Sequence, residues 1–169
     1  CVGILASFPI GVLLALGRQS QLPAIRVVCT AFIELWRGVP LITVLFFSTR
    51  VLPLLLSPSM ARQIPDLVSV LIGVSLFTSA YIAEVVRGAL QVIPKGQSEA
   101  ARALGMGYWH LNFLITLPQA IKIAVPGIVG IYIGLFKETT LVEIVGIFDL
   151  LGQIMLAAPD TAWTSAVTA

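Results

Sequence analysis

Long stretches without charge alternate with short polar segments along this chain, and their spacing predicts a series of membrane-spanning helices. A bilayer core of ~30 Å needs about 20 apolar residues in a helix, with about 17 as the lower limit. The sequence predicts four spans, at about 1–17, 33–54, 67–83 and 123–136. Polar segments at 19–23, 57–66 and 94–122 separate them.

The second predicted span needs a charged residue at each boundary. Its uncharged part, 38–49, has 12 residues, which reach only about 18 Å as a helix. We therefore place Arg37 at the inner boundary and Arg50 near the other. Gly38 and Pro40 are expected to break the helix beside Arg37, because proline lacks an amide proton. Arg37 serves either as a gate or as a side chain that extends to the lipid head groups.

The composition agrees with a membrane protein and excludes a soluble enzyme or a disordered tail. Of 169 residues, 58% are hydrophobic and 11% are charged, with a mean hydropathy of +1.01. A soluble domain carries about 25% charged residues, and a globule of this size cannot bury so much apolar surface. We predict a single all-α, polytopic transmembrane bundle over 1–169, lying in a lipid bilayer and binding no nucleic acid. The chain opens inside an apolar run at Cys1 and stops at Ala169, so we expect it to be part of a longer protein.

The distribution of basic residues predicts which end of the bundle faces the cytoplasm. Lys and Arg are enriched in the cytoplasmic segments of membrane proteins. With 94–122 inside, seven basic residues lie on or near the inner side, and three lie outside or toward it. The inner set is Arg18, Arg26, Arg37, Arg87, Lys95, Arg102 and Lys122, and the outer set is Arg50, Arg62 and Lys137. This excess favours a cytoplasmic location for 94–122.

Small residues are spaced for close helix packing in two of the predicted spans. The third span has a ridge with a spacing of four, and the fourth has a GxxxG pair. These residues are Ser75, Ser79 and Ala83 in the third span, and Gly127, Gly130 and Gly134 in the fourth. Such ridges let helix backbones approach each other in lipid. For the glycines, the alternative is close approach of the backbone to a passing solute.

Ionisable residues at membrane depth are costly, so each is a candidate functional residue. Glu84 and Arg87 are three apart on one helical face and form either a structural ion pair or a gate. Tyr81 faces the same region and is a candidate lining residue of a solute path. His110 is the only histidine and has no cluster of carboxylates or cysteines beside it, so we expect no metal site.

A polar segment that follows the fourth span is a second candidate for binding a solute. Lys137, Glu138, Thr139 and Thr140 are consecutive. They serve either as a cap at the membrane interface or as a site for a zwitterion. In the second case Glu138 pairs with an ammonium group and Lys137 with a carboxylate.

The segment at 94–122 carries the most specific pattern in the chain. Residues 100–104 are good helix formers, Glu99 suits the start of a short helix, and Gly105 suits a tight turn after it. Seven residues occur at fixed spacing: Glu99, Ala100 and Ala101, then Gly105 after three residues, Ile115 after nine more, and Leu117 and Pro118 after one more. This string resembles the EAA loop of binding-protein-dependent ABC importer permeases at every fixed position.

Three further segments resemble the polar amino acid permeases of that family, and the general L-amino acid uptake permeases are the most similar. They are 33–41, with Arg37, Gly38 and Pro40; 79–97, with Tyr81, Glu84 and Arg87; and 137–142, with Lys137, Glu138, Thr139 and Thr140. Val39 stands where threonine is usual, and Glu138 where aspartate is usual, which leaves the substrate range open.

The resemblance implies the fold of type I ABC importer permeases and a transport function in a bacterial inner membrane. It implies an external amino-acid-binding protein, a second permease subunit that is identical or paralogous, and a pair of ATPase subunits that grip the helix at 99–105. ATP binds to those partners, and this chain is expected to be no enzyme and to hold no cofactor of its own. The sequence agrees, because it contains no GxxxxGK[ST] segment to cradle phosphates.

Other interpretations fit parts of the pattern. An ion-gradient-driven transporter or channel would use Glu84 and Glu138 as ion carriers, but it leaves the fixed spacing of the loop motif unexplained. A membrane scaffold would use the loop only to dock a partner. The loop could also form an amphipathic helix on the inner leaflet, fixed by Tyr108, Trp109 and Phe113.

Overall fold

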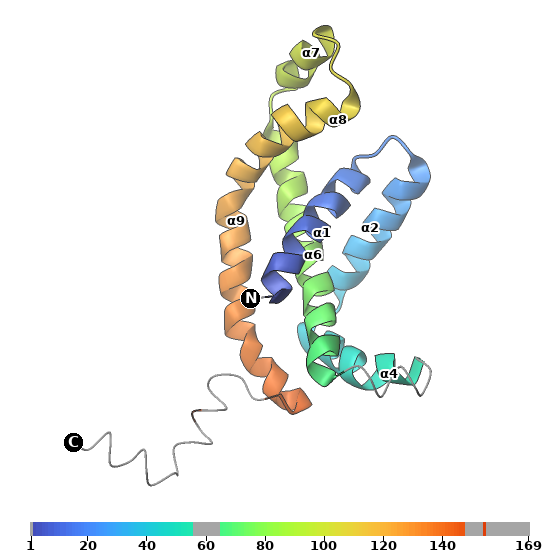
Figure 1. Cartoon of the computed structure of the whole chain (residues 1–169), viewed down its shortest axis with the longest axis vertical. Coiled ribbons are helices and arrows are strands. Elements are labelled where there is room, and N and C mark those ends of the chain that lie inside the picture. The colour runs from blue at the N-terminus through green and yellow to red at the C-terminus, as the bar shows by residue number, and fades with distance from the viewer. Residues whose placement is uncertain (1, 56–64, 148–153, 155–169) are drawn as a thin grey trace, which may run out of the picture.

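Helices account for all the regular structure in the part of the chain that the computed structural model describes, residues 2–55, 65–147 and 154. They are α1 (Val2–Arg18), α2 (Pro23–Gly38), α3 (Leu41–Phe46), the π-helical η1 (Phe47–Val51), α4 (Leu52–Leu55), α6 (Asp66–Val92), α7 (Lys95–Ala103), α8 (Tyr108–His110), the π-helical η2 (Leu111–Thr116), α9 (Leu117–Glu138) and the 3-10 helix η3 (Thr139–Val145). α1, α2, α6 and α9 form a bundle, and α7 and α8 lie beyond one end of it (Figure 1). The all-α class is confirmed. The predicted loop at 57–66 lies almost wholly outside the described residues.

α1 packs closely along α6 because small residues line the contact. A Cβ added to Gly11 would lie 2.7 Å from Ile82 Cγ2 and 2.9 Å from the Ser79 carbonyl oxygen. A Cβ on Gly3 would lie 3.6 Å from Ser75 Oγ. The predicted small-residue ridge of the third span is therefore a packing surface, and it is α1 that uses it.

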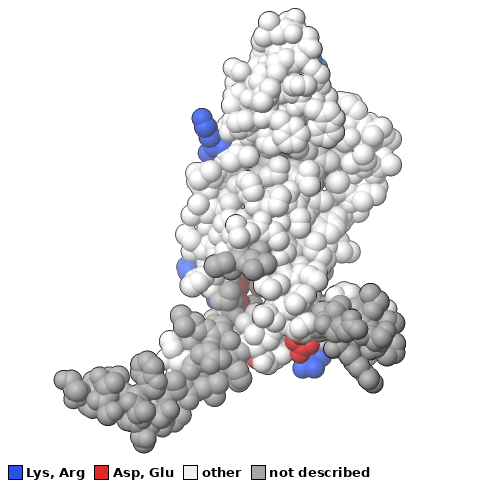
Figure 2. All heavy atoms as spheres, viewed as in Figure 1, with Lys and Arg blue, Asp and Glu red and all other residues white. Residues whose placement is uncertain are grey.

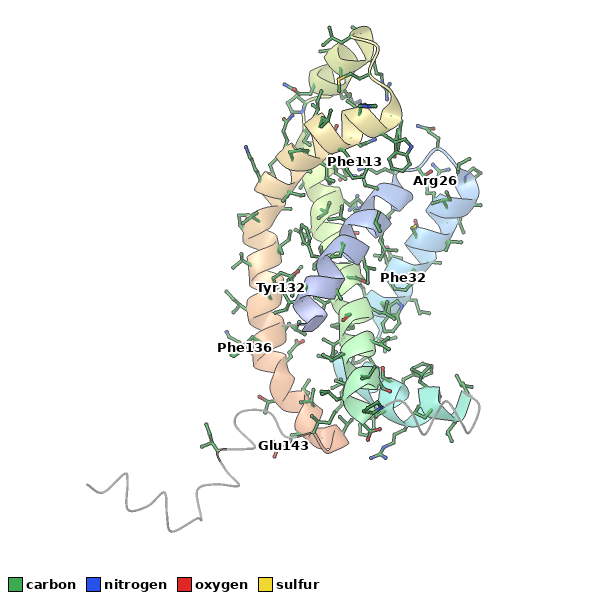
Figure 3. All side chains as sticks on the ribbon, in the orientation of Figure 1. Arg26, Phe32, Phe113, Tyr132, Phe136 and Glu143 are labelled. Carbon is green, nitrogen blue, oxygen red and sulfur yellow. The ribbon has the colours of Figure 1, made fainter. Side chains whose placement is uncertain are left out.

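α9 crosses the bundle on another side of α6 and also contacts α1. The Tyr132 hydroxyl donates a hydrogen bond to the Ile4 carbonyl oxygen at 3.2 Å, so it joins α9 to α1 (Figure 3). A Cβ on Gly127 would lie 2.8 Å from Val85 Cγ1 of α6. Gly130 and Gly134 meet no described atom within 4 Å. Within the described chain these two glycines make no close helix contact, so the predicted GxxxG packing face stays a prediction.

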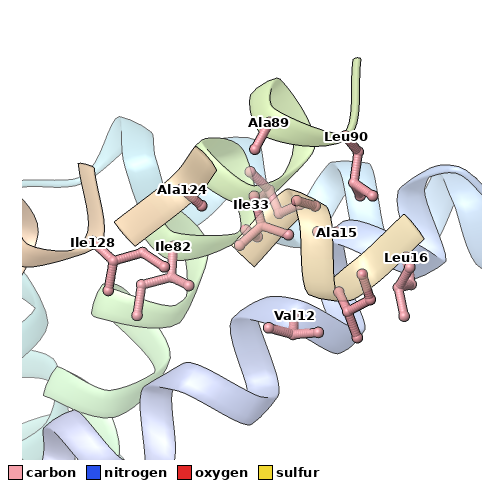
Figure 4. Packing of buried hydrophobic residues seen from close by; sticks show 13 residues of the cluster. Val12, Ala15, Leu16, Ile33, Ile82, Ala89, Leu90, Ala124 and Ile128 are labelled. Atoms are coloured by element: carbon pink, nitrogen blue, oxygen red, sulfur yellow. The ribbon is translucent and has the colours of Figure 1, made fainter. Parts of the chain in front are cut away.

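The main core lies where α1, α2, α6 and α9 meet (Figure 4). Ala15, Ile33 and Ile82 are fully buried there, and Ala124 is 1% exposed. Lipid tails are as apolar as these side chains, so the gain in a bilayer comes from close packing rather than from removal of water. The two alanines let the helix backbones approach, and the isoleucines fill the space between them.

The second predicted span is not one straight helix. α2 begins at Pro23, ten residues before the predicted start at 33, and the chain then bends by 105° into Leu41–Leu55. Val39 is extended at the bend, with φ −108° and ψ 133°. This follows from Pro40, which disfavours the helical region for the preceding residue and donates no amide hydrogen bond. The predicted helix break is confirmed, and the span predicted at 33–54 is a bent pair of helices that begins earlier, at Pro23.

α6 is the longest regular α-helix in the described chain and is a candidate membrane span. Its 27 residues, Asp66–Val92, extend about 40 Å at 1.5 Å per residue. It continues nine residues past the predicted end at 83, so Glu84 and Arg87 lie inside it. The ion pairs of Glu84, described below, let the helix carry these charges.

Two described helices are long and apolar enough to cross a membrane, namely α6 and the continuous helical segment Tyr108–Val145. The bent pair of α2 and Leu41–Leu55 brings the number to three if it is one span, and α1 is apolar but shorter. Figure 2 shows one face of the bundle with only scattered charged side chains. The four predicted apolar segments are therefore helical, but they differ in length and in continuity.

The segment at 94–122 is a helix, a tight turn and the start of a second long helix, rather than a loop throughout. From Tyr108 onward α8, η2 and α9 form one continuous helical segment. The wider π turn of η2 ends at Thr116, two residues before Pro118. A wider turn at this point accommodates a proline that cannot join the regular hydrogen-bond ladder. The predicted loop therefore ends near Gly107, well before Lys122.

Candidate functional site

α7 is a short helix with a defined start and end. It begins at Lys95, directly after Pro94, and ends in a Schellman motif. The Met106 amide donates to the Ala101 carbonyl at 3.1 Å, and the Gly105 amide donates to the Arg102 carbonyl at 2.9 Å. Gly105 has a φ of +76°, a conformation that glycine adopts without strain. The predicted turn at Gly105 is confirmed.

α7 presents one exposed face and one that faces the protein. Glu99 and Ala100 are exposed, whereas Ala101 is 2% exposed. Glu99 is the fifth residue of the helix, so the prediction that it starts the helix is wrong. The helix begins earlier, directly after the extended Pro94, whose carbonyl oxygen accepts from the Gln97 amide at 3.1 Å. Of the three consecutive motif residues, Glu99 and Ala100 therefore lie on the outer surface of α7, and Ala101 packs against the rest of the protein.

The second half of the motif lies in the helix that returns to the bundle. Ile115 is half-buried, Leu117 is 7% exposed and belongs to the main core, and Pro118 is exposed. Through the buried side chain of Leu117, this half of the motif packs into the main core of the bundle. α7 is joined directly to α6 on one side and through α8 and η2 to α9 on the other.

A carboxylate in α6 is the centre of an ion-pair network. Glu84 Oε2 accepts from Arg18 Nη1 at 2.9 Å and lies 3.7 Å from Arg37 Nη1. Its other oxygen, Oε1, accepts from Arg87 Nε at 3.0 Å and also from Arg87 Nη2. Arg18 Nη2 in turn pairs with Glu34 Oε1 at 3.1 Å. The pairing of Glu84 with Arg87 agrees with the sequence prediction.

The network joins three helices. Arg18 comes from α1, Glu34 and Arg37 come from α2, and Glu84 and Arg87 come from α6. Each carboxylate oxygen of Glu84 has at least one guanidinium partner, so its charge is well compensated in a setting where an unpaired charge is costly. The sequence analysis did not connect Arg18 and Glu34 with this site. They lie on two different helices, α1 and α2, which the turn at 19–22 connects.

A cavity of about 190 Å³ lies between α6 and α9. It brings together Tyr81 and Glu138, two residues that are 57 positions apart and were both predicted as path residues. The other lining residues are Phe77, Thr78, Ile131, Gly134 and Leu135. The hydroxyl oxygen of Thr78 is buried and has no hydrogen-bond partner among the described residues. A buried hydroxyl without a partner is costly, which makes Thr78 a candidate hydrogen-bonding residue for a ligand of the cavity.

The ion-pair network and the cavity meet at Tyr81. The guanidinium carbon of Arg37 lies 5.7 Å from the centre of the Tyr81 ring, which is a cation–π distance. The Tyr81 ring in turn packs on Phe77 with a centroid separation of 4.9 Å. Phe77, Thr78 and Tyr81 share one face of α6, and that spacing was the available signal for Phe77 and Thr78, two of the lining residues that the sequence analysis missed.

Comparison with known proteins decides the family. The family described as "Binding-protein-dependent transport system inner membrane component" matches residues 7–169 of this chain. The chain belongs to this family. YhdY of Escherichia coli K12, named an inner membrane amino-acid ABC transporter permease protein, is 53% identical over 96% of this chain and 44% of its own length. BztC of Rhodobacter capsulatus, named a glutamate/glutamine/aspartate/asparagine transport system permease protein, is 50% identical over 95% of this chain and 37% of its own.

A solved structure agrees with this family assignment. The chain matches a structure titled "Crystal structure of an amino acid ABC transporter with histidines" with a TM-score of 0.76 and 29% identity, over 95% of this chain and 73% of that one. The fold is therefore that of an ABC transporter membrane component. The chain spans less than half of the length of YhdY and of BztC.

In this family member, the other predicted path residues lie apart from the cavity. Gly38 and Pro40 flank the bend between α2 and α3, and Arg37 reaches the cavity only through Tyr81. Lys137 and Thr140 are exposed, and neither is among the residues that line the cavity. Thr139 begins η3. Of Lys137 and Glu138, only Glu138 is among the residues that line the cavity, and their pairing around one zwitterion stays a prediction.

Proposed function

We propose that this chain forms the membrane-spanning permease part of an ABC importer for amino acids in a bacterial inner membrane. Membership of the transport family supports the transport role, and the names of YhdY and BztC support amino acids as the cargo. The observation that carries the proposal is α7, a helix beyond the end of the bundle whose Glu99 and Ala100 are exposed (Figure 1).

α7 is the proposed docking element for the ATPase subunits. Ala100 leaves room for a partner surface, and Glu99 offers a carboxylate for an Arg or Lys of the ATPase. α7 lies between α6 and the helix that includes α9, and the cavity lies between the same two helices. A displacement of α7 by the ATPase therefore acts on both walls of the cavity, which is how a rigid-body switch transmits work.

The cavity is the proposed site through which the amino acid passes. The carboxylate of Glu138 pairs with the ammonium group of the substrate, and the Thr78 hydroxyl donates to its carboxylate. Arg37, held over Tyr81, adds positive potential close to the same wall. Phe77, Ile131 and Leu135 are left to contact the substrate side chain. No proton transfer or bond cleavage is required, so the chain acts as a path and not as an enzyme.

The proposed partners are a second permease subunit, an external amino-acid-binding protein and a pair of ATPase subunits that bind the ATP. α9 has room for a neighbour, because Val125, Val129 and Ile133 are each about half exposed. Gly130 lies between them with open space around it. An apolar face with a glycine suits either lipid or the closely packed helix of a second subunit, identical or paralogous.

An ion-gradient-driven transporter is the less favoured alternative. A carboxylate that carries ions must release its partner ion in each cycle. Glu84 is instead held by Arg18, Arg37 and Arg87, so that three cations compete with any transported one. Only Glu138 would remain from the predicted pair of carriers.

Reconstituted transport tests the proposal. The full-length protein, its second subunit, the ATPase pair and the binding protein are placed in liposomes, and uptake of radiolabelled glutamate, glutamine and aspartate is measured with ATP inside. Gly105→Val is expected to lower ATP-driven uptake at least tenfold, because a β-branched residue is strained at a φ of +76°. Gly105→Asn is the matched control, since asparagine tolerates that conformation. Uptake in wild-type liposomes that continues without ATP, or equal uptake by both variants, contradicts the proposal.

A further inference from the structure

The strongest unassigned feature is a pair of adjoining cavities at the α7 end of the bundle. One has a volume of about 390 Å³ and is lined mostly by polar residues, and the other has a volume of about 490 Å³ and is lined mostly by apolar residues. Gln21 and Tyr108 line both of them. The two cavities therefore meet at the turn between α1 and α2, opposite the start of α8.

The polar cavity is cationic. Lys95 and Arg102 of α7 line it, together with amide side chains such as Gln19, Gln91 and Asn112. No carboxylate is among the described residues that line it, and neither Lys95 nor Arg102 forms an ion pair with a residue that the structure describes. Two uncompensated cations beside several amide donors fit an anion.

The apolar cavity has the character of a site for a hydrocarbon chain. Leu13, Leu16, Leu22 and Ile25 line it from α1, the turn and α2, and Trp109 lines it from α8. Leu13, Leu22 and Trp109 are 63%, 59% and 64% exposed, respectively. A small soluble anion bound in the polar cavity would leave these apolar side chains exposed, whereas the hydrocarbon chain of an amphiphile would cover them.

Aromatic residues mark this end of the molecule as a membrane boundary. Tyr108, Trp109 and Phe113 form a contiguous group, with centroid separations of 5.4 Å and 5.8 Å. Figure 3 shows Phe113 at the same end as Arg26, a further exposed cation in the first turn of α2. Trp and Tyr collect at the level of lipid head groups, and basic residues collect on the cytoplasmic side.

We propose that this pair of cavities binds one anionic phospholipid of the inner leaflet. Its phosphate lies between Lys95 and Arg102, and one acyl chain lies along the apolar cavity past Trp109. Lys95, Ser98 and Arg102 line the cavity, whereas Glu99 and Ala100 do not. The lipid therefore occupies the inner side of α7 and leaves the proposed ATPase surface free. This inference concerns a second site and does not depend on which solute is transported.

Native mass spectrometry of the whole transporter complex tests the proposal. The complex in detergent is titrated with phosphatidylglycerol, with phosphatidylcholine and with inorganic phosphate. Phosphatidylglycerol is expected to occupy one site per copy of this chain at a concentration at least ten times lower than phosphatidylcholine. Each basic residue near an anionic lipid raises the affinity by roughly a factor of five. The double variant Lys95→Gln with Arg102→Gln is therefore expected to bind phosphatidylglycerol about 25-fold more weakly.

Matched variants separate the proposed site from general charge effects. Lys122→Gln removes an exposed cation that lines neither cavity, and it is expected to leave lipid occupancy unchanged. Trp109→Ala is expected to weaken phosphatidylglycerol without creating a preference for phosphatidylcholine. Equal occupancy by the two lipids in the wild-type complex overturns the proposal even if the double variant fails to assemble. Displacement of the lipid by millimolar inorganic phosphate also overturns it. So does a complex with the ATPase bound that takes up no phosphatidylglycerol, because the ATPase would then fill the polar cavity.

Discussion

The guanidinium group of Arg37 lies over the ring of Tyr81, 5.7 Å from its centre. Arg37 belongs to the last turn of α2, directly before the 105° bend, and it also lies 3.7 Å from Glu84. Tyr81 lines the cavity between α6 and α9. This one contact therefore joins the bend, the ion-pair network and the proposed substrate path.

Replacement of Tyr81 separates the role of its ring from that of its hydroxyl. Tyr81→Leu is expected to lower ATP-driven uptake about two- to fivefold, since a cation–π contact at a partly exposed site contributes about 0.5–1 kcal/mol. Tyr81→Phe keeps the ring and is expected to retain uptake within about twofold. Uptake is measured in the reconstituted complex with both variants at equal protein density. Equal losses in the two variants would show that the hydroxyl, and not the ring, matters.

Loss of the Glu84 carboxylate is expected to destabilise the bundle. Glu84→Gln leaves three arginines without their shared counter-charge. Removing one partner of a buried pair costs about 3–5 kcal/mol, and since Glu84 retains 23% exposure, solvent screening reduces the expected cost to about 2 kcal/mol. The measurement is the thermal midpoint of the complex in detergent. Glu34→Gln, at a side chain that is 57% exposed, is the control and is expected to cost less than about 1 kcal/mol.

The two kinds of glycine are expected to respond differently to alanine. Gly11→Ala places a methyl group 2.7 Å from Ile82 Cγ2 and is expected to cost about 1–3 kcal/mol, because α1 must move away from α6. Gly130→Ala meets no described atom within 4 Å. In the isolated chain it is expected to be neutral or slightly stabilising, since alanine is the better helix former. Thermal unfolding in detergent checks both, and similar effects at the two positions would contradict the packing described here.

The sequence predicted much of this architecture but not its tertiary contacts. Charge-free stretches identified the helices, and Pro40 identified the bend, because both are local properties of the chain. The position of Glu99 within α7 was missed, since Lys95, Gly96 and Gln97 gave no apolar signal for an earlier start. The arginine network was also missed. Arg18 meets Glu84 only because α1 packs on α6, and no local pattern encodes that pairing.

Thr78 offers a test of the cavity in which stability and transport are expected to diverge. Thr78→Val removes a buried hydroxyl that has no partner among the described residues, so the thermal midpoint is expected to rise or stay the same. The same change removes a proposed hydrogen bond to the substrate carboxylate. The KM of uptake is therefore expected to rise roughly tenfold, since a hydrogen bond to a charged group contributes about 1.5–3 kcal/mol. Thr78→Ser keeps the hydroxyl and is the control, and an unchanged KM in Thr78→Val would exclude Thr78 from the path.

Site-specific cross-linking tests the central claim most directly, namely that the outer face of α7 is the contact with the ATPase. Cysteine is introduced at Ala100, which is exposed on α7, and at Val129, which is exposed on α9, in a chain whose native cysteines are replaced by serine. The whole complex is treated with a short reagent that carries one thiol-reactive group and one photoactivated group, so that the ATPase needs no cysteine, and the products are identified by mass spectrometry. The account predicts a cross-link between Ala100→Cys and the ATPase, and none from Val129→Cys to the ATPase. A complex that hydrolyses ATP and transports normally, yet links the ATPase through Val129→Cys and never through Ala100→Cys, would contradict it.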